Sequence, residues 1–178
     1  KDSIKRAIDK GAGRIDAEQY QEVMYEGYGP QGVAILVSCL SDNKNRTVAE
    51  VRHAFTKYGG NLGTTGSVSY MFVRKAMLMC DSVVDEDAFM NAVLDYDVED
   101  ISFLGDGVAC VEMSPGVLAS VVDFCQSQNL NIVDSDVLWQ ADTAVEIDDE
   151  NSEKLERLVT ALDELDDVQA VYTSAQNV

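Results

Sequence analysis

Histidine is nearly absent from this chain, and that absence weighs against catalysis. His53 is the only imidazole among 178 residues, and it falls on the solvated side of an expected helix, beside Arg52. No Ser-His-Asp or Cys-His arrangement stands out around it. We therefore expect a protein that is not an enzyme.

Cysteine is scarce and scattered. The four cysteines lie 41, 30 and 15 residues apart, without a Cys-x-x-Cys pair. With one histidine in addition, the spacing of a zinc site is missing, so we expect no metal and no cofactor. Each cysteine lies in an apolar run, where a free thiol behaves as a small hydrophobic group. Buried reduced thiols are typical of the cytosol, and we expect a cytoplasmic protein with these thiols at Cys39, Cys80, Cys110 and Cys125.

Long apolar runs are missing as well. None reaches 18 residues, so the sequence offers no membrane span, and 46% hydrophobic with 25% charged residues is a globular composition. Carboxylates are abundant, but the acidic stretches 97–100, 148–150 and 163–167 lack the spacing of a calcium-binding loop. We expect these stretches to be solvated loops and helix ends.

Positive charge is scarce and unevenly spread. The chain holds 13 Lys and Arg against 32 Asp and Glu, for a net charge of −19. Residues 1–75 hold 11 basic and 8 acidic residues, whereas residues 76–178 hold 2 and 24. The second region would repel polyphosphate, so any contact with nucleic acid must come from the first region or from residues before Lys1. For the acidic region, a surface kept for solubility is the plain alternative.

The first part of the chain predicts one βαβ unit. A short strand at 22–32 enters a loop, and the run GVAILVSCL at 32–40 predicts a core strand. Apolar residues at helical spacing over 45–60 predict a helix that stops at two glycines. Alternation over 67–73 predicts the next strand. Residues 1–13 read as the last turns of an earlier helix.

The rest of the chain predicts a second, complete unit, followed by the remaining elements of the first. Residues 75–141 show the order βαββαβ of a ferredoxin-like module. A strand at 143–148, a strongly amphipathic helix at 149–167 and a strand at 168–175 follow. We therefore expect an α+β protein of two ferredoxin-like sandwich domains, one inserted in the other, after a remnant helix of a helical domain. The expected domains are 1–14 (remnant helix), 15–74 with 142–178 (split domain) and 75–141 (acidic insertion).

One helix and the loop after it are the candidate functional surface. Cations cluster around the helix at Lys44, Arg46, Arg52 and Lys57, where they could hold phosphates, although Glu50 sits among them. A solvated helix face is the alternative. The loop GGNLGTTG could cradle a phosphate through backbone amides, but it lacks the lysine of a Walker loop, and a plain connection is the alternative.

Three stretches carry a recognisable pattern: KRAIDKGAG near the amino end, a near-continuous block from Tyr25 to Phe72, and ELDDVQAVYTSA near the carboxyl end. They closely resemble the YebC/PmpR family, also called DUF28. The match covers nearly the whole chain in order, although the inserted module resembles the family only in pattern. The resemblance implies a basic helical domain, mostly absent here, followed by two ferredoxin-like domains of which one interrupts the other.

The resemblance also implies a role in gene expression. Family members are described as transcriptional regulators that bind promoter DNA, and the family includes a mitochondrial translational activator and proteins proposed to assist ribosomes. We therefore expect a nucleic-acid partner, promoter DNA or ribosomal RNA, with the ribosome or another protein at the acidic surface and no membrane. The alternative is a regulator that senses a small molecule between its two ferredoxin-like domains. The expected phosphate contacts are Lys5, Arg6, Lys10, Lys44, Arg46, Arg52 and Lys57, beside a loop shaped by Gly60, Asn61, Gly63 and Thr64.

Overall fold

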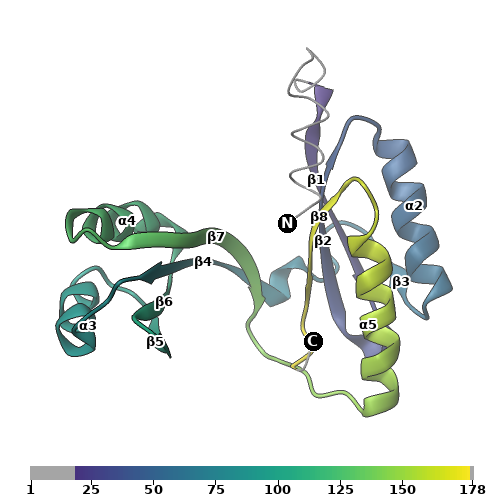
Figure 1. The fold of residues 1–178 in the computed structure, drawn as a ribbon. Helices are drawn as coiled ribbons and strands as arrows, with labels where there is room; N and C mark the ends of the chain where they lie inside the picture. The colour runs from purple at the N-terminus through teal and green to yellow at the C-terminus, as the bar shows by residue number, and fades with distance from the viewer. Residues whose placement is uncertain (1–18, 177–178) are drawn as a thin grey trace. The chain divides into compact units, whose positions relative to one another are not determined.

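The structure is a computed structural model and describes residues 19–176. These residues form two compact units, drawn in Figure 1. The outer one, unit 1, runs to Phe72 and resumes at Ala141, and the inserted one, unit 2, is Val73–Gln140. Within the described residues each unit has a four-stranded sheet and two α-helices, so the predicted α+β class with two ferredoxin-like domains is confirmed. The remnant helix expected within residues 1–14 lies outside the described residues.

Unit 1 has the strand order of a ferredoxin-like sheet, but its strands come from separated parts of the chain. The order is β3-β1-β2-β8. β1 (Gln21–Tyr28) pairs antiparallel with β2 (Ala34–Ser41) along its whole length. In a contiguous βαββαβ unit the third strand lies between the first and the second. Here β2, β3 and β8 take the places of the first, second and fourth strands, and β1, which precedes β2 in the chain, takes the place of the third. The other elements are α2 (Lys44–Lys57), β3 (Asn61–Leu62), α5 (Asp149–Asp163) and β8 (Val168–Thr173).

The core of unit 1 lies between the sheet and its two helices. Alternate residues of the β2 segment turn to one face, where both helices pack, and α2 and α5 lie side by side over the sheet in Figure 1. The helices form because their apolar residues recur every three or four positions, which places them on one side. Full burial of such a side chain stabilises the fold by roughly 2 kcal/mol. The fully buried core members include Ile35, Val37, Val51, Phe55, Leu155, Leu158 and Leu162.

Unit 2 is a contiguous ferredoxin-like unit, as predicted. Its strand order is β5-β6-β4-β7, the order that a βαββαβ chain adopts. Both helices pack on one face, where Leu78 and Val111 of the sheet meet Phe89 and Val121 of the helices. The elements are β4 (Phe72–Asp81), α3 (Glu86–Leu94), β5 (Asp100–Gly105), β6 (Val108–Met113), a 3-10 turn (Pro115–Val117), α4 (Leu118–Ser127) and β7 (Asn131–Ala141).

The strand predicted at 67–73 is wrong. Ser69–Met71 forms a 3-10 turn, and β4 of unit 2 begins only at Phe72. Two amides that a strand would have used for its ladder, those of Val68 and Ser69, donate instead to a buried carboxylate of β1. The short strand β3, paired with the end of β1, takes the place that was predicted for this segment.

The strand predicted at 143–148 is also wrong. A single parallel bridge joins Val145 to Ala175, supported by hydrogen bonds of 2.7 Å from Val145 N to Ser174 O and 2.9 Å from Gln176 N to Val145 O. Thr143, Ala144 and Glu146 are exposed, so this short segment has no sheet face to bury. The alternation of apolar and polar residues at 143–148 had suggested a strand with one buried face.

The cysteines follow the prediction with one exception. All four are free; Cys39, Cys80 and Cys125 are buried, and Cys110 is partly exposed. Burial, helped by a nearby carboxylate, Asp167, raises the pKa of the Cys39 thiol to about 12, so this thiol stays protonated. Within residues 19–176, none of the helices is both long and apolar enough to cross a membrane.

Candidate nucleic-acid interface

Helix α2 presents one charged face to solvent. Its first turn is capped by Asn43, whose side-chain oxygen accepts a hydrogen bond of 3.1 Å from Arg46 N. The buried side of α2 comprises Thr47, Val51, Ala54 and Phe55. The positions that remain face water, and four of them were predicted to hold phosphates.

Three of those four cations have no salt bridge to any described residue. Lys44, Arg52 and Lys57 are exposed, and no carboxylate within the described part of the chain forms a salt bridge with them. The Lys57 ammonium lies 5.5 Å from the centre of the Tyr58 ring, a distance at which a cation is attracted to the ring face. Glu50, the one acid of the helix, is half-buried. The net charge of α2 is therefore positive.

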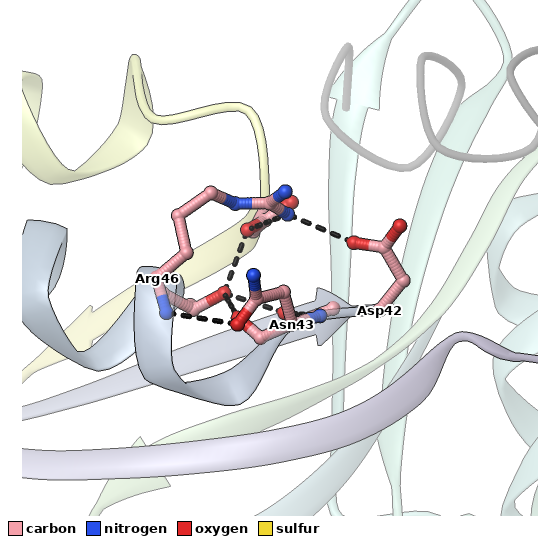
Figure 2. A network of polar contacts seen from close by, with 6 residues as sticks. Asp42, Asn43 and Arg46 are labelled. Atoms are coloured by element: carbon pink, nitrogen blue, oxygen red, sulfur yellow. Dashed lines mark hydrogen bonds and ion pairs between the residues drawn. The ribbon is translucent and has the colours of Figure 1, made fainter.

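The fourth cation, Arg46, is held by two carboxylates (Figure 2). Its Nη2 lies 2.9 Å from Asp42 Oδ1 and 2.8 Å from Asp167 Oδ2. The hydrogen bond to Asp167, followed by that to Asp42, raises the guanidinium pKa above its usual value. One cation with two anions leaves this group with a net negative charge. Arg46 therefore positions the start of α2 and adds little cationic charge to the surface.

Asp167 is the buried centre of that network. It is 6% exposed, and its Oδ2 also accepts a hydrogen bond of 2.6 Å from Thr47 Oγ1, while its backbone oxygen accepts one of 2.8 Å from Leu40 N. Thr47 Oγ1 lies 2.5 Å from Ser41 Oγ. The prediction of solvated acidic ends is thus wrong for Asp167. Its side-chain partners lie more than 100 residues away, so no local pattern could have identified it.

The loop after α2 is organised by a second buried carboxylate, that of Glu26. The Glu26 side chain is on β1 and only 4% of the residue is exposed. Its oxygens accept hydrogen bonds of 2.7 Å from Gly66 N, 3.0 Å from Val68 N and 2.7 Å from Ser69 N. Burial opposes ionisation, but these backbone hydrogen bonds outweigh it and lower the pKa of Glu26. These three amides donate to a carboxylate of the protein itself, so they are not available to bind a phosphate.

The predicted loop-shaping residues occupy four distinct places. Gly60 passes so close to β1 that a Cβ would lie 2.5 Å from Tyr28 O. A Cβ on Gly63 would lie 2.7 Å from Ser67 Oγ. Asn61 pairs with Tyr28 in the sheet, and Thr64 O accepts a hydrogen bond of 3.1 Å from Ser67 N. Close approach to the sheet and the turn at Thr64 therefore fix the loop.

Helix α5 limits the cationic surface on one side. A shallow groove of about 470 Å³ lies between Tyr58, at the end of α2, and the exposed side of α5. Glu153, Glu156 and Glu164 line it, together with Arg157, whose guanidinium is 3.7 Å from Glu153. A phosphate backbone would be repelled there. The cations predicted at Lys5, Arg6 and Lys10 lie outside the described residues.

These observations define an α+β protein of two ferredoxin-like units, one inserted in the other, with a cationic helix exposed on the outer unit. A family model described as the second and third domain of TACO1/YebC matches residues 20–175. The chain therefore belongs to the TACO1/YebC family, and the resemblance seen in the sequence is confirmed.

Relatives and a solved structure agree with this assignment. A "Probable transcriptional regulatory protein" of Francisella tularensis subsp. mediasiatica is 47% identical over 98% of this chain and 71% of its own. One of Neisseria meningitidis serogroup B has the same identity over 98% of this chain and 72% of its own. The crystal structure of a "Conserved Hypothetical Protein" from Aquifex aeolicus has a TM-score of 0.78 at 40% identity, covering 97% of this chain and 72% of that one.

Proposed function

We propose that the chain is a non-catalytic regulator of gene expression that contacts nucleic acid through the exposed face of α2. The observation that carries this proposal is that Lys44, Arg52 and Lys57 are exposed and form no salt bridge within residues 19–176, on a helix in an otherwise acidic chain. Phosphate contacts supply most of the sequence-independent affinity for nucleic acids. The names of the relatives support a role in transcription.

The framework around α2 suits such a contact. Asp167 fixes the start of the helix and Glu26 fixes the loop that follows it. A cation held on a rigid element loses less conformational freedom on binding than one on a mobile loop. Arg46 contributes to this framework and not to the contact. Lys5, Arg6 and Lys10 remain part of the proposed cationic surface because residues 1–18 hold five basic and four acidic residues, unlike the strongly acidic remainder of the chain.

The target is promoter DNA or ribosomal RNA. The acidic unit 2 repels either polymer, so it limits the contact to α2 and the residues that precede it. Cytoplasmic action fits the buried free thiols. The competing idea of a small-molecule sensor stays a prediction from sequence.

The test replaces two of these three cations. Arg52→Ala with Lys57→Ala is expected to weaken binding of labelled duplex DNA or an rRNA fragment roughly tenfold at low salt. The slope of log affinity against log salt concentration should fall by about 2, one for each phosphate that a cation no longer neutralises. Fluorescence anisotropy over a salt titration measures both, and the polymer that shows the effect identifies the target.

A matched control separates local contact from net charge. Lys154→Ala with Arg157→Ala removes the same charge from α5, where each cation already lies near a glutamate, at 3.5 Å and 3.7 Å. This variant should bind like the unmodified protein. Equal reductions of affinity in the two double variants, or no reduction in either, would show that α2 is not the contact surface.

A further inference from the structure

Unit 2 carries an apolar groove that the proposed function does not use. The groove has a volume of about 390 Å³ and lies between α3 and α4, at the end of β4. Ala88 and Ala92 of α3 and Phe124 of α4 line it, together with Phe89, which is 6% exposed. The rings of Phe89 and Phe124 are 6.2 Å apart between centres. The two alanines leave room above this pair of rings.

An exposed valine extends the apolar surface at one end. Val84 also lines the groove and is 98% exposed, the largest exposure among the large hydrophobic residues described. A single exposed hydrophobic residue is ordinary on a protein surface. Here it adjoins a groove with an aromatic floor, so apolar surface continues from the floor to the rim. Such continuous surfaces mark binding sites.

Carboxylates stand at both ends of α3, the helix that forms one wall of the groove; Asp85 lines the groove itself. Asp85 and Asp95 share one face of α3 with the two alanines, because the spacing of 3, 4 and 3 residues follows the helical repeat. Asp85 and Asp95 are ten positions apart, or about 15 Å along the axis of the nine-residue helix that they flank. Asp85 Oδ1 accepts a hydrogen bond of 3.1 Å from Ala88 N, and its other oxygen has no partner among the described residues. Asp81 adds a third at the β4 end, where it accepts a hydrogen bond of 3.0 Å from Ser82 Oγ.

The cations of unit 2 are far from this end. Residues 73–140 hold 13 acidic and 2 basic residues, Arg74 and Lys75, for a net charge of −11. Both cations are near the start of β4, about 20 Å or more along the strand from Asp81. Lys75 forms an ion pair with Glu99. The groove is therefore surrounded by negative charge, which repels nucleic acid and acidic peptides and attracts basic ones.

We infer that this groove binds a lysine- and arginine-rich segment of a partner protein. An apolar side chain of the segment sits on Phe89 and Phe124, and flanking cations meet Asp85 and Asp95. A helical segment with cations about ten residues apart spans the same distance as these carboxylates. This is recognition of an amphipathic helix in a groove, with charge setting the choice of partner. It is independent of the role of α2.

The test uses a synthetic probe and the whole chain. The probe is a fluorescein-labelled helical peptide of about 15 residues, with leucines on one face and lysines and arginines at both ends. A second peptide carries glutamate in place of every basic residue. The basic peptide is expected to bind, with affinity that falls as salt is raised, and the acidic peptide is not.

Two variants locate the site. Ala88→Lys places a long cation in the middle of the groove and should weaken binding by about tenfold or more. Gln126→Lys is the matched control, because it adds the same charge at an exposed position of α4 away from Phe124 on the helical repeat. It should change affinity by less than about twofold. Val84→Ser should weaken binding roughly threefold and leaves the core intact, since Val84 is 98% exposed.

Several results would overturn the inference. One is a wild-type chain that binds neither peptide, and another is equal weakening of binding by Ala88→Lys and Gln126→Lys. A third is a dimer, seen by light scattering, that Ala88→Lys dissociates, which would make the occupant a second copy of this chain. Circular dichroism checks that the variants fold; if Ala88→Lys does not, an unchanged affinity of Val84→Ser is by itself enough to reject the groove.

Discussion

Helices α2 and α5 pack on the same sheet but differ in the charge that they present. α2 carries four basic residues and one acidic residue, whereas α5 carries five acidic and two basic residues. Their buried sides are alike, since both fill one core with aliphatic and aromatic side chains. The apolar side of a helix decides where it packs, and the exposed side is free to differ. A fold can therefore keep its architecture while only one of its helices becomes a candidate binding surface.

The two helices also differ in how their ends are fixed. The two carboxylates that are buried among the described residues, Glu26 and Asp167, both serve α2. Asp167 follows α5 in sequence but binds the first turn of α2. Glu26 holds the loop after α2. Three predictions test how much the buried carboxylates and the exposed charges of these helices contribute to the free energy of unfolding.

The largest effect is expected from Asp167→Ala. The change removes the partner of Arg46 and Thr47 in a buried site, and it should lower the free energy of unfolding by roughly 3 kcal/mol. Urea unfolding followed by circular dichroism measures it. Asp42→Ala is the matched control, since Asp42 binds the same guanidinium from an exposed position, and should cost less than about 1 kcal/mol. Similar destabilisation by the two variants would contradict the central place given to Asp167.

A smaller effect, with a defined pH dependence, is expected from Glu26→Gln. The neutral side chain cannot accept three amide hydrogen bonds as a carboxylate does, so the variant should be less stable by about 2 kcal/mol at neutral pH. The pKa of Glu26 is lowered in the folded protein, so its contribution is complete above the pKa of the unfolded chain, about 4.3. It is lost as the pH falls through the lower, folded pKa.

Unfolding at neutral pH and near pH 3 checks this dependence. The difference in stability between Glu26→Gln and the wild type should shrink in acid. A difference that stayed constant with pH would mean that shape, and not charge, makes Glu26 important for the loop.

The smallest effect on stability is expected from the exposed charges themselves. Arg52→Ala with Lys57→Ala on α2, and Lys154→Ala with Arg157→Ala on α5, should each change the free energy of unfolding by less than about 1 kcal/mol, because surface charges contribute little to folding. Thermal unfolding measures both. A large destabilisation in the α2 variant would assign its cations a structural role and weaken their proposed use in binding.

Sequence patterns predicted the parts of the structure that depend on neighbouring residues. The helix α2 was expected at 45–60 and the unit 2 order at 75–141, and both are found because periodic burial is encoded within each segment. The strands expected at 67–73 and 143–148 are absent. In the first, local alternation was outweighed by hydrogen bonds to Glu26, about 40 residues earlier. Arg46 was expected to be a phosphate contact. Its partner Asp167 lies 121 residues away, so no local pattern could show that the guanidinium is held within the protein.

By itself, the sequence determined the family, the composition of the two units and the amphipathic helices, since each follows from residues close together in the chain. Only the tertiary structure decided that β1 fills the sheet of unit 1, that Asp167 and Glu26 are buried, and which cations of α2 form no salt bridge with the rest of the described chain. Those outcomes depend on which distant groups meet after folding. A hydrogen bond or ion pair across more than 100 residues leaves no periodic trace in either of the segments that it joins.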